Sequence, residues 1–410
     1  MSAPAAQQAA PPPAPPQPPP REPASSFWRS TALPSLLSVV MALAVGAVLI
    51  ALSDDDVRAA SSYFFSRPTD ALVALYQSVV QAYGALFRGS VVDLGGSGAA
   101  GVLGPLANTL LFATPLIAGG LAVAIPFKAG MFNIGTEGQI TVAAVFAAYV
   151  GFAFQLPPVV HLLAAVIAGL LGGALWGAIP GVLKATTGAH EVITTIMLNY
   201  VARFGILYAL GTTYFQREGR ADPISPPIAD TATLPRLLDF SRLNLGLLLA
   251  LAAAALAWWL INRSTVGFRL RAVGANPEAA RTAGMSVPRA YITAMVLAGT
   301  FAGVAGVSQV LGSERVLTTG ISAGLGFDAI TVALLGRANP VGVIGAGLLF
   351  GALKAGGLTM QATTGTSLDI VVVLQALIVL FIAAPALISA VFRLKSTGAG
   401  VGQLSKGWNG

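Results

Sequence analysis

Several uninterrupted apolar stretches of this sequence are long enough to cross a lipid bilayer, and they restrict the fold more than any other feature. A membrane-spanning helix needs about 20 predominantly apolar residues. Hydrophobic residues make up 55% of the 410 residues and charged residues only 10%, whereas about a quarter of the residues of a soluble domain are charged. We therefore predict an all-α polytopic membrane protein.

The apolar runs predict ten transmembrane helices. They cover approximately residues 33–52, 106–127, 132–154, 159–183, 190–212, 244–262, 290–311, 321–337, 341–360 and 369–392. The run over 321–337 is short and interrupted by glycine, so a re-entrant loop is the alternative there. Together with their connections, these helices form a predicted transmembrane domain over 29–392.

Three further segments differ from the apolar runs in composition. Residues 1–28 are Pro-rich, cannot form a core, and predict a disordered cytoplasmic tail. Residues 393–410 predict a second cytoplasmic tail. Residues 53–105 predict an outer segment, in which the helical periodicity of Thr69–Phe87 indicates an amphipathic helix lying on the outer surface or packed on the bundle. We expect no cleaved signal peptide, because the first apolar run is long and no A-x-A-like site follows it.

Basic residues determine the predicted orientation, because Lys and Arg in short loops disfavour translocation. With ten helices the loops that carry an excess of basic residues fall on one side, which is then cytoplasmic, whereas the arginines of the outer segments are balanced by acids; the basic positions on the inner side are Lys128, Lys184, the 263–289 loop, Arg337, Arg393, Lys395 and Lys406. Both termini are therefore expected in the cytoplasm. These loops account for the net charge of +7, so the charge gives no reason to expect nucleic-acid binding.

The loop over 263–289 is the longest strongly basic interruption of the apolar pattern. It has five arginines and one acid, Glu278, for a net charge of +4. Asn276 and Pro277 predict a helix start, because Asn caps helices and Pro is tolerated at the first helical position. The short helix that follows would end at Gly284. Such a helix is suited to contact a soluble partner, and a solvated turn is the alternative.

Two short sequences recur in the same order along the chain. Ile140–Ala143 returns 190 residues later as Ile330–Ala333, and Gly169–Leu175 returns 178 residues later, with one substitution, as Gly347–Leu353. In the predicted topology, the two members of each pair run in opposite directions. This pattern indicates an inverted-topology repeat, in which the substrate path follows the interface of the two halves. Chance recurrence in a sequence rich in Ala, Gly, Leu and Val is the alternative.

Polar and ionisable side chains within predicted helices are candidates for the substrate path, because they are costly inside a membrane. The candidates are Asn133, Glu137, Gln139, Asn199 and Asp328. On a helix, Asn133 and Glu137 would share a face, and the repeat assigns Glu137 and Asp328 nearly equivalent positions. A role in helix packing is the alternative for these residues. Arg203 is a candidate ion-pair partner for one of the acids.

The composition also excludes several kinds of chemistry. Without cysteine, the chain has no disulfides, thiolate metal sites or cysteine nucleophiles, and two histidines leave little for a histidine-ligated metal. No G-x-x-x-x-G-K-[ST] sequence is present to bind the phosphates of ATP. No paired carboxylates or serine–histidine set stands out. We predict no catalytic residue, metal site or cofactor in this chain.

Three motifs carry a resemblance to a known family. KAGMFNIGTEGQI (residues 128–140), GAHEVITTIMLNYV (188–201) and RAVGANPEAARTAGMSV (271–287) are similar to motifs of ABC-importer permeases for branched-chain amino acids, sugars and nucleosides, and of the nucleoside branch in particular. Within the third, Glu278-Ala279-Ala280 followed by Gly284 resembles the EAA loop, which docks on the ATP-binding subunit. The resemblance covers about residues 100–392.

The resemblance implies a permease subunit in the cytoplasmic (inner) membrane that performs no chemistry itself. It implies a second permease, as a homo- or heterodimer, together with an ATP-binding ABC subunit and an extracytoplasmic solute-binding protein. A nucleoside is the expected solute, with a simple sugar or branched-chain amino acid as the alternative. An ion-coupled secondary transporter using Glu137, Asp328 or Arg203 is a further alternative, but it leaves the EAA-like pattern unexplained.

Overall fold

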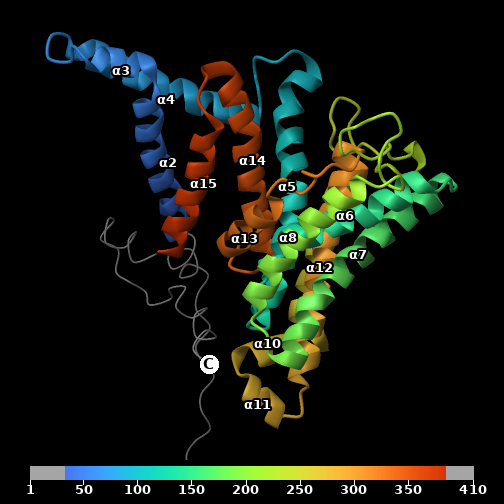
Figure 1. The fold of residues 1–410 in the computed structure, drawn as a ribbon. Helices are drawn as coiled ribbons and strands as arrows, with labels where there is room; N and C mark the ends of the chain where they lie inside the picture. Colours follow the sequence, from blue (N-terminus) through green and yellow to red (C-terminus); the bar gives the residue numbers. More distant parts are fainter. Residues whose placement is uncertain (1–32, 385–410) are drawn as a thin grey trace, which may run out of the picture.

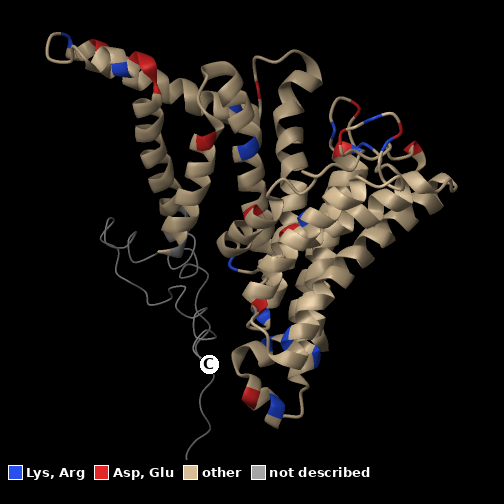
Figure 2. Cartoon of the chain, viewed as in Figure 1, with Lys and Arg blue, Asp and Glu red and all other residues tan. Residues whose placement is uncertain are grey.

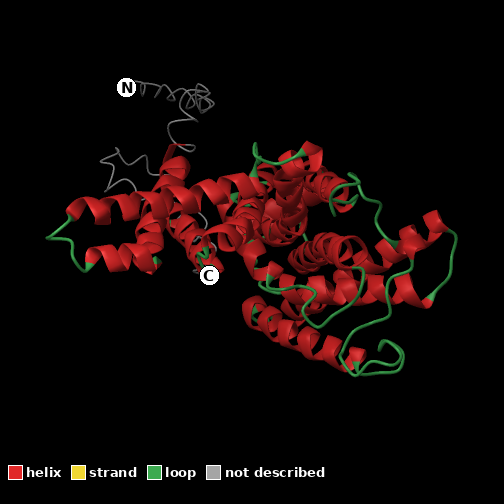
Figure 3. Ribbon diagram, turned by 90° about the horizontal axis from the view of Figure 1, so that it is seen from above, coloured by secondary structure: helices red, strands yellow, loops and turns green. Residues whose placement is uncertain are grey.

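A computed structural model describes residues 33–384 of the protein as helices joined by loops (Figures 1 and 3). The helices are α2 (Leu33–Ser53), α3 (Asp55–Ser61), α4 (Pro68–Ser90), α5 (Gly98–Lys128), α6 (Thr136–Ala153), α7 (Pro158–Thr187), α8 (Glu191–Leu210), the short 3-10 helix η2 (Asp230–Ala232), α9 (Gly246–Arg263), α10 (Thr265–Ala275), α11 (Pro277–Thr282), α12 (Val287–Val307), the π-helix η3 (Ser308–Glu314), α13 (Leu325–Leu335), α14 (Pro340–Thr364) and α15 (Leu368–Ala383). The predictions for 1–28, for 393–410 and for the end of the last apolar run lie outside the described residues.

The described helices confirm an all-helical protein with several membrane spans. Six of them are long and apolar enough to cross a membrane, namely α5, α7, α8, α9, α12 continued by η3, and α14. The bent pair α2 and α3 makes a seventh if it is counted as one span, and α13 and α15 are shorter apolar helices. Each of the ten predicted runs contains one helix, although α5 begins eight residues before the predicted start and α6 begins four residues after it.

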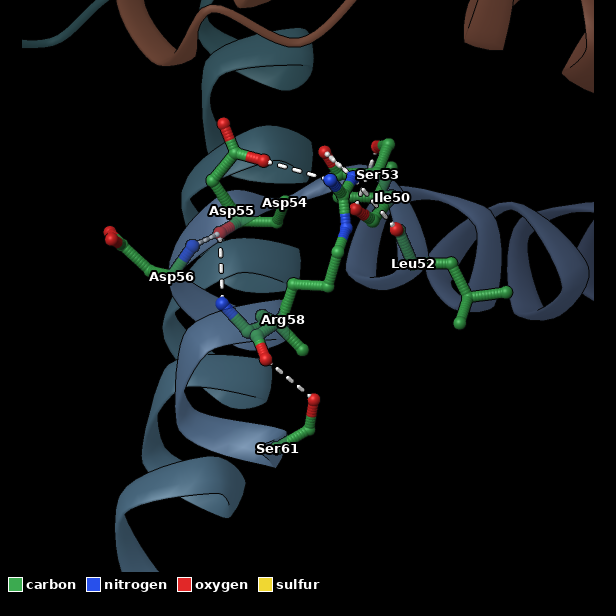
Figure 4. A network of polar contacts seen from close by, with 9 residues as sticks. Ile50, Leu52, Ser53, Asp54, Asp55, Asp56, Arg58 and Ser61 are labelled. Atoms are coloured by element: carbon green, nitrogen blue, oxygen red, sulfur yellow. Dashed lines mark hydrogen bonds and ion pairs between the residues drawn. The ribbon is translucent and has the colours of Figure 1, made fainter. Parts of the chain in front are cut away.

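The chain turns sharply between α2 and α3, which meet at an angle of 74°. The Asp54 carboxylate accepts hydrogen bonds from the backbone N–H groups of Asp56 and Val57, at 2.9 and 3.2 Å, and so caps α3. The Arg58 guanidinium donates to the carbonyls of Leu52 and Ser53 at the end of α2 (Figure 4). Because these side chains satisfy the backbone groups that the break exposes, the turn needs no glycine.

Helix α4 packs on the bundle through its second half. The Tyr83 hydroxyl donates to the Leu43 carbonyl in α2, and Gly89 lies directly against Thr359 of α14. The amphipathic helix predicted over Thr69–Phe87 lies within α4. The hairpin of α3 and the first half of α4 protrudes from the rest of the molecule in both views (Figures 1 and 3).

Glycines allow the closest helix pair, α7 and α12, to touch backbone to backbone. A Cβ at Gly299 would collide with the carbonyl oxygen of Gly173, and a Cβ at Gly173 would collide with the carbonyl oxygen of Gly299. Small residues permit this approach, and packing between helices replaces the hydrophobic effect as the source of association in lipid. This contact joins the first half of the chain to the second.

The loops lie mainly at the two ends of the bundle, and so do most of the charged residues (Figure 2). At the end that carries α3, residues 211–245 cover the termini of α6 and α7. His161 of α7 is fully buried and binds this loop, with Nδ1 2.7 Å from the Thr231 hydroxyl and Nε2 2.9 Å from the Val150 carbonyl. The opposite end carries α10 and α11 (Figure 1).

The region over 263–289 contains two helices where the sequence analysis predicted one. The predicted start at Asn276 and Pro277 is confirmed, because Asn276 Oδ1 accepts the Ala279 N–H at 3.0 Å and α11 begins at Pro277. The missed helix is α10, which Ser264 caps through the Gly267 N–H at 3.0 Å. Its two arginines made the segment resemble a basic loop, although six of its eleven residues are apolar and Ser264 is a suitable N-cap.

We expect Gly299→Ala to destabilise the protein. The added methyl group must displace the backbone of α7, an overpacking that costs roughly 1–3 kcal/mol. Thermal unfolding of the detergent-solubilised variant should therefore begin several degrees lower, as measured by the loss of monodisperse protein on size-exclusion chromatography. Gly205→Ala is the matched control, because a Cβ at Gly205 in α8 meets no atom within 4 Å. An equal melting temperature for both variants would contradict the packing argument.

Candidate functional site

The chain is not helical between α5 and α6, and this interruption forms one side of the candidate site. Helix α5 ends at Lys128, just before Gly130 with its φ of +72°, and Asn133 Oδ1 then accepts the Gly135 N–H at 3.0 Å, a local turn that competes with helical hydrogen bonding. Helix α6 consequently begins at Thr136. The prediction that Asn133 and Glu137 share a helix face is wrong, because Asn133 precedes the helix and the two side chains contact different partners.

Two carboxamides pair within the protein interior at this interruption. Asn133 and Gln139 are 0% and 1% exposed. Asn133 Nδ2 lies 3.0 Å from Gln139 Oε1, and Gln139 Nε2 lies 3.4 Å from Asn133 Oδ1. Asn133 Nδ2 also lies 3.2 Å from the Ala122 carbonyl of α5. Buried amides must be paired in this way, because each unsatisfied group costs free energy. In this conformation both side chains serve to hold α6 against α5.

Asn199 of α8 holds the same interruption from the opposite side. Its Nδ2 donates to the Ile134 carbonyl at 2.9 Å, and its Oδ1 accepts the Gly138 N–H at 2.9 Å. These are two of the backbone groups that the break and the first turn of α6 leave without helical partners. A single side chain therefore links α8 to the irregular segment and to the helix that follows it.

Glu137 connects this site to the second half of the chain. Its carboxylate accepts the Gly324 N–H at 3.0 Å and the Gly326 N–H at 2.7 Å, at the start of α13. A Cβ at Gly326 would collide with the backbone nitrogen of Glu137, so only glycine permits the contact. Since Glu137 also lies in the first turn of α6, its negative charge stabilises the N-termini of two helices at once.

Both α6 and α13 begin inside the bundle. Gly119 of α5 lies beside Thr136 and Ala329, residues from the first turns of the two helices. The Ala122 carbonyl that Asn133 contacts is six residues, or about two turns, before α5 ends at Lys128. The site is therefore surrounded by helices inside the bundle.

Asp328 lies in the first turn of α13. It is half-buried, within electrostatic reach of Glu137 and of Lys354. The Lys354 ammonium lies 5.9 Å from the centre of the Phe112 ring, a cation–π distance. The five predicted path residues thus all lie at or beside the starts of α6 and α13. Among the described residues, no group of three or more His, Asp or Glu side chains is placed to hold a metal ion.

Two residues near the site were not singled out by sequence reasoning, and one expected partner lies elsewhere. The Trp176 indole N–H is buried without a hydrogen-bond partner among the described atoms, next to Gly138; only the fold brings it there. Glu191 forms an ion pair with Lys184 at 3.0 Å.

Arg203 is exposed on α8 and makes no ion pair within residues 33–384, so its predicted pairing with an acid is wrong.

The α11 end of the molecule contacts the interruption through α10. A Cβ at Gly274 would collide with the Lys128 carbonyl, and the Gly130 N–H is the next nearest group. Within α11, Glu278 is exposed and accepts two 3.1 Å contacts from Arg281, and Ala279 is exposed beside it. Ala280 is buried, and Gly284 adopts a φ of +81° just after the helix.

Comparison with known proteins gives one family and several relatives. The family described as the branched-chain amino acid transport system permease component matches residues 106–383. The guanosine ABC transporter permease protein NupP of Bacillus subtilis is 38% identical over 373 residues, which cover 90% of this chain and 98% of that protein. The glucose ABC transporter permease protein TsgB13 of Haloferax volcanii is 34% identical over 371 residues, covering 87% of each. A second Bacillus subtilis guanosine permease protein, NupQ, is 28% identical over 256 residues, covering 59% of this chain and 78% of that protein.

We expect Asn199→Leu to lower the stability of the protein. The substitution leaves the Ile134 carbonyl and the Gly138 N–H buried without a partner, at a cost of roughly 1–3 kcal/mol for each group. A lower thermal unfolding temperature in detergent would report this loss. Asn262→Leu is the matched control, since Asn262 is exposed and donates only to the Trp258 carbonyl of its own helix. If the two variants unfold together, the clamp does not stabilise the interruption.

Proposed function

This chain belongs to the family of branched-chain amino acid transport system permeases and is a permease subunit of an ABC importer, not an enzyme; from this premise we propose that it carries a nucleoside across the cytoplasmic (inner) membrane. The match to the guanosine permease NupP, over 98% of that protein's length, carries the choice of solute. The similarity to TsgB13 makes glucose the second candidate. The amide and carboxylate groups at the starts of α6 and α13 suit either polar solute.

The proposed orientation places α10 and α11 in the cytoplasm. Five arginines of the 263–289 region lie at that end, in agreement with the retention of basic loops. The ATP-binding subunit would dock there on α11, through Glu278, Ala279, Ala280 and Gly284. The segment 53–105 and the loop 211–245 would then face the solute-binding protein on the outside, and both termini would be cytoplasmic.

The second permease subunit is proposed to be a paralogue. Bacillus subtilis has two guanosine permease proteins that are similar to this chain, NupP at 38% and NupQ at 28% identity. Two different permease proteins named for one solute are what a heterodimer requires. Because the identity to NupP is higher and extends over nearly its full length, we expect this chain to be the counterpart of NupP in such a pair.

Helix contacts support an inverted repeat within ten transmembrane helices. Under the repeat, α5, α6 and α7 correspond to α12, α13 and α14. Helix α7 packs against α12, and α14 packs against α5; likewise α6 packs against α12, and α13 against α5. The recurring sequence contributes equivalent contacts, because Gly173 touches the backbone of α12 and Gly351 touches the Thr109 carbonyl of α5. Each half therefore packs a helix on the other half's first helix.

The mechanism we propose is alternating access about the Glu137 contact. In this conformation the carboxylate holds the starts of α6 and α13 together, and the carboxamides of Asn133, Gln139 and Asn199 are occupied by protein partners. A movement of α11 with the ATPase would pass through α10 and Gly274 to the interruption before α6. Separation of α6 from α13 would then expose these groups, and Asp328, to the solute.

The first test is assembly. We expect the tagged chain, purified in mild detergent, to bring down an ATP-binding protein and a second permease in stoichiometric amounts, identified by mass spectrometry. Glu278→Lys should abolish stimulation of the ATPase without affecting insertion, because it reverses the charge at the docking helix and leaves Arg281 without its acidic partner. Glu218→Lys, the same change on an exposed residue of the outer loop, is the control. Stimulation at the wild-type level in the Glu278 variant would refute docking through this residue.

The second test is uptake by the assembled complex in liposomes. Labelled guanosine should accumulate with ATP, and excess unlabelled nucleoside should compete where glucose does not; the reverse would favour the sugar. Glu137→Ala should reduce uptake at least about tenfold, because it removes two charge-assisted hydrogen bonds. Asp369→Ala, at the exposed start of α15, is the control. If uptake and assembly are unchanged in the Glu137 variant, Glu137 serves only in helix packing and not in the solute path.

A further inference from the structure

A pocket opens beside α11, between α10 and the start of α12. Val266, Leu270, Met285 and Ala290 provide its apolar walls, and the turn after α11 closes one side. Arg269 comes from α10 and Arg289 from the first turn of α12. The two arginines are 20 positions apart in sequence, so it is the fold that brings both to one pocket.

Neither arginine of this pocket is neutralised by the chain itself. Arg269 and Arg289 are exposed and form no ion pair within residues 33–384. The one acid of the 263–289 region, Glu278, is bound by Arg281 at 3.1 Å. A guanidinium presents a planar set of donors that matches a carboxylate. Two such groups at a pocket with apolar walls therefore favour a carboxylate on an otherwise apolar segment.

The retention of basic loops in the cytoplasm depends on the number of Lys and Arg residues, and it does not require two of them to lie at one pocket. Three other arginines of the same region, Arg263, Arg271 and Arg281, contribute equally to that charge but do not line the pocket. Helix α10, which provides Val266, Arg269 and Leu270 to the pocket, also packs through Gly274 directly against the Lys128 carbonyl at the end of α5. A movement of α10 caused by binding at this pocket would therefore act directly on residues 128–130, which precede α6.

We propose that this pocket receives an aspartate or glutamate side chain of the ATP-binding subunit, as a second contact next to α11. The inference rests on the proposed docking of that subunit at this end, and it adds the chemistry of the partner surface. The pocket adjoins α11, so one partner surface covers both. Glu278 contributes a negative charge and the pocket two positive charges, which together define the orientation of the partner.

The test compares two double variants of equal charge. Arg269→Glu with Arg289→Glu removes the pocket, whereas Arg263→Glu with Arg271→Glu changes the same region outside it. Affinity for the ATP-binding subunit that co-purifies is measured with the permease complex in nanodiscs of uncharged lipid. We expect the pocket variant to bind at least about tenfold more weakly and the control to change less than about threefold. Equal losses, or no loss in either, would overturn the proposal. If the wild-type chain binds no such subunit, it is the proposed function that fails.

A lipid headgroup is the competing anion, and nanodiscs containing an anionic lipid distinguish it. A defect of the pocket variant that appears only with anionic lipid would assign the pocket to the membrane and overturn the proposal.

The partner residue can then be identified by crosslinking. Because the chain has no cysteine, Ser286→Cys introduces a single thiol at the pocket. Its crosslink should map close to an acidic residue of the ATP-binding subunit. Changing that acid to arginine should restore binding to the Arg269→Glu and Arg289→Glu variant, and failure of this rescue would also contradict the proposal.

Discussion

The Glu137 carboxylate is the interaction on which the centre of this structure depends. It is negatively charged within a bundle of apolar helices, where an unpaired charge is costly. Its stabilisation comes from backbone N–H groups of Gly324 and Gly326 and from the N-terminal ends of α6 and α13. Since Glu137 belongs to the first half of the chain and Gly324 and Gly326 to the second, the hydrogen bonds of this half-buried carboxylate link the two halves.

Close backbone contacts between helices connect this link to more distant parts of the molecule. Gly173 and Gly299 bring α7 and α12 together, and Gly274 brings α10 against the end of α5. At such contacts a helix cannot move without displacing its neighbour. The α11 end is therefore mechanically connected to the interruption at Asn133, and through Asn199 and Glu137 to α8 and α13. This connection is the physical basis of the proposed coupling between ATP use and access to the solute.

Sequence reasoning succeeded where the signal was local. The start of α11 followed from Asn276 and Pro277, and the ten apolar runs each contain a helix. It failed where a local rule was overridden. Helical spacing put Asn133 and Glu137 on one face, but α5 ends at Lys128 and the Asn133 side chain accepts the Gly135 N–H in a turn before α6. Charge suggested a loop over 265–275, but the Ser264 cap and packing against α9 and α5 make it α10.

The sequence by itself determined that this chain is a helical membrane protein, where its long basic loop with a capped helix lies, and which polar side chains enter the apolar region. These properties follow from the length of apolar runs and from neighbouring residues, which act over a few positions. Only the tertiary structure decided that Glu137 meets α13, that Arg203 faces outward, and that Arg269 and Arg289 share a pocket. Such contacts join distant positions, and helix packing selects them because every buried polar group needs a partner.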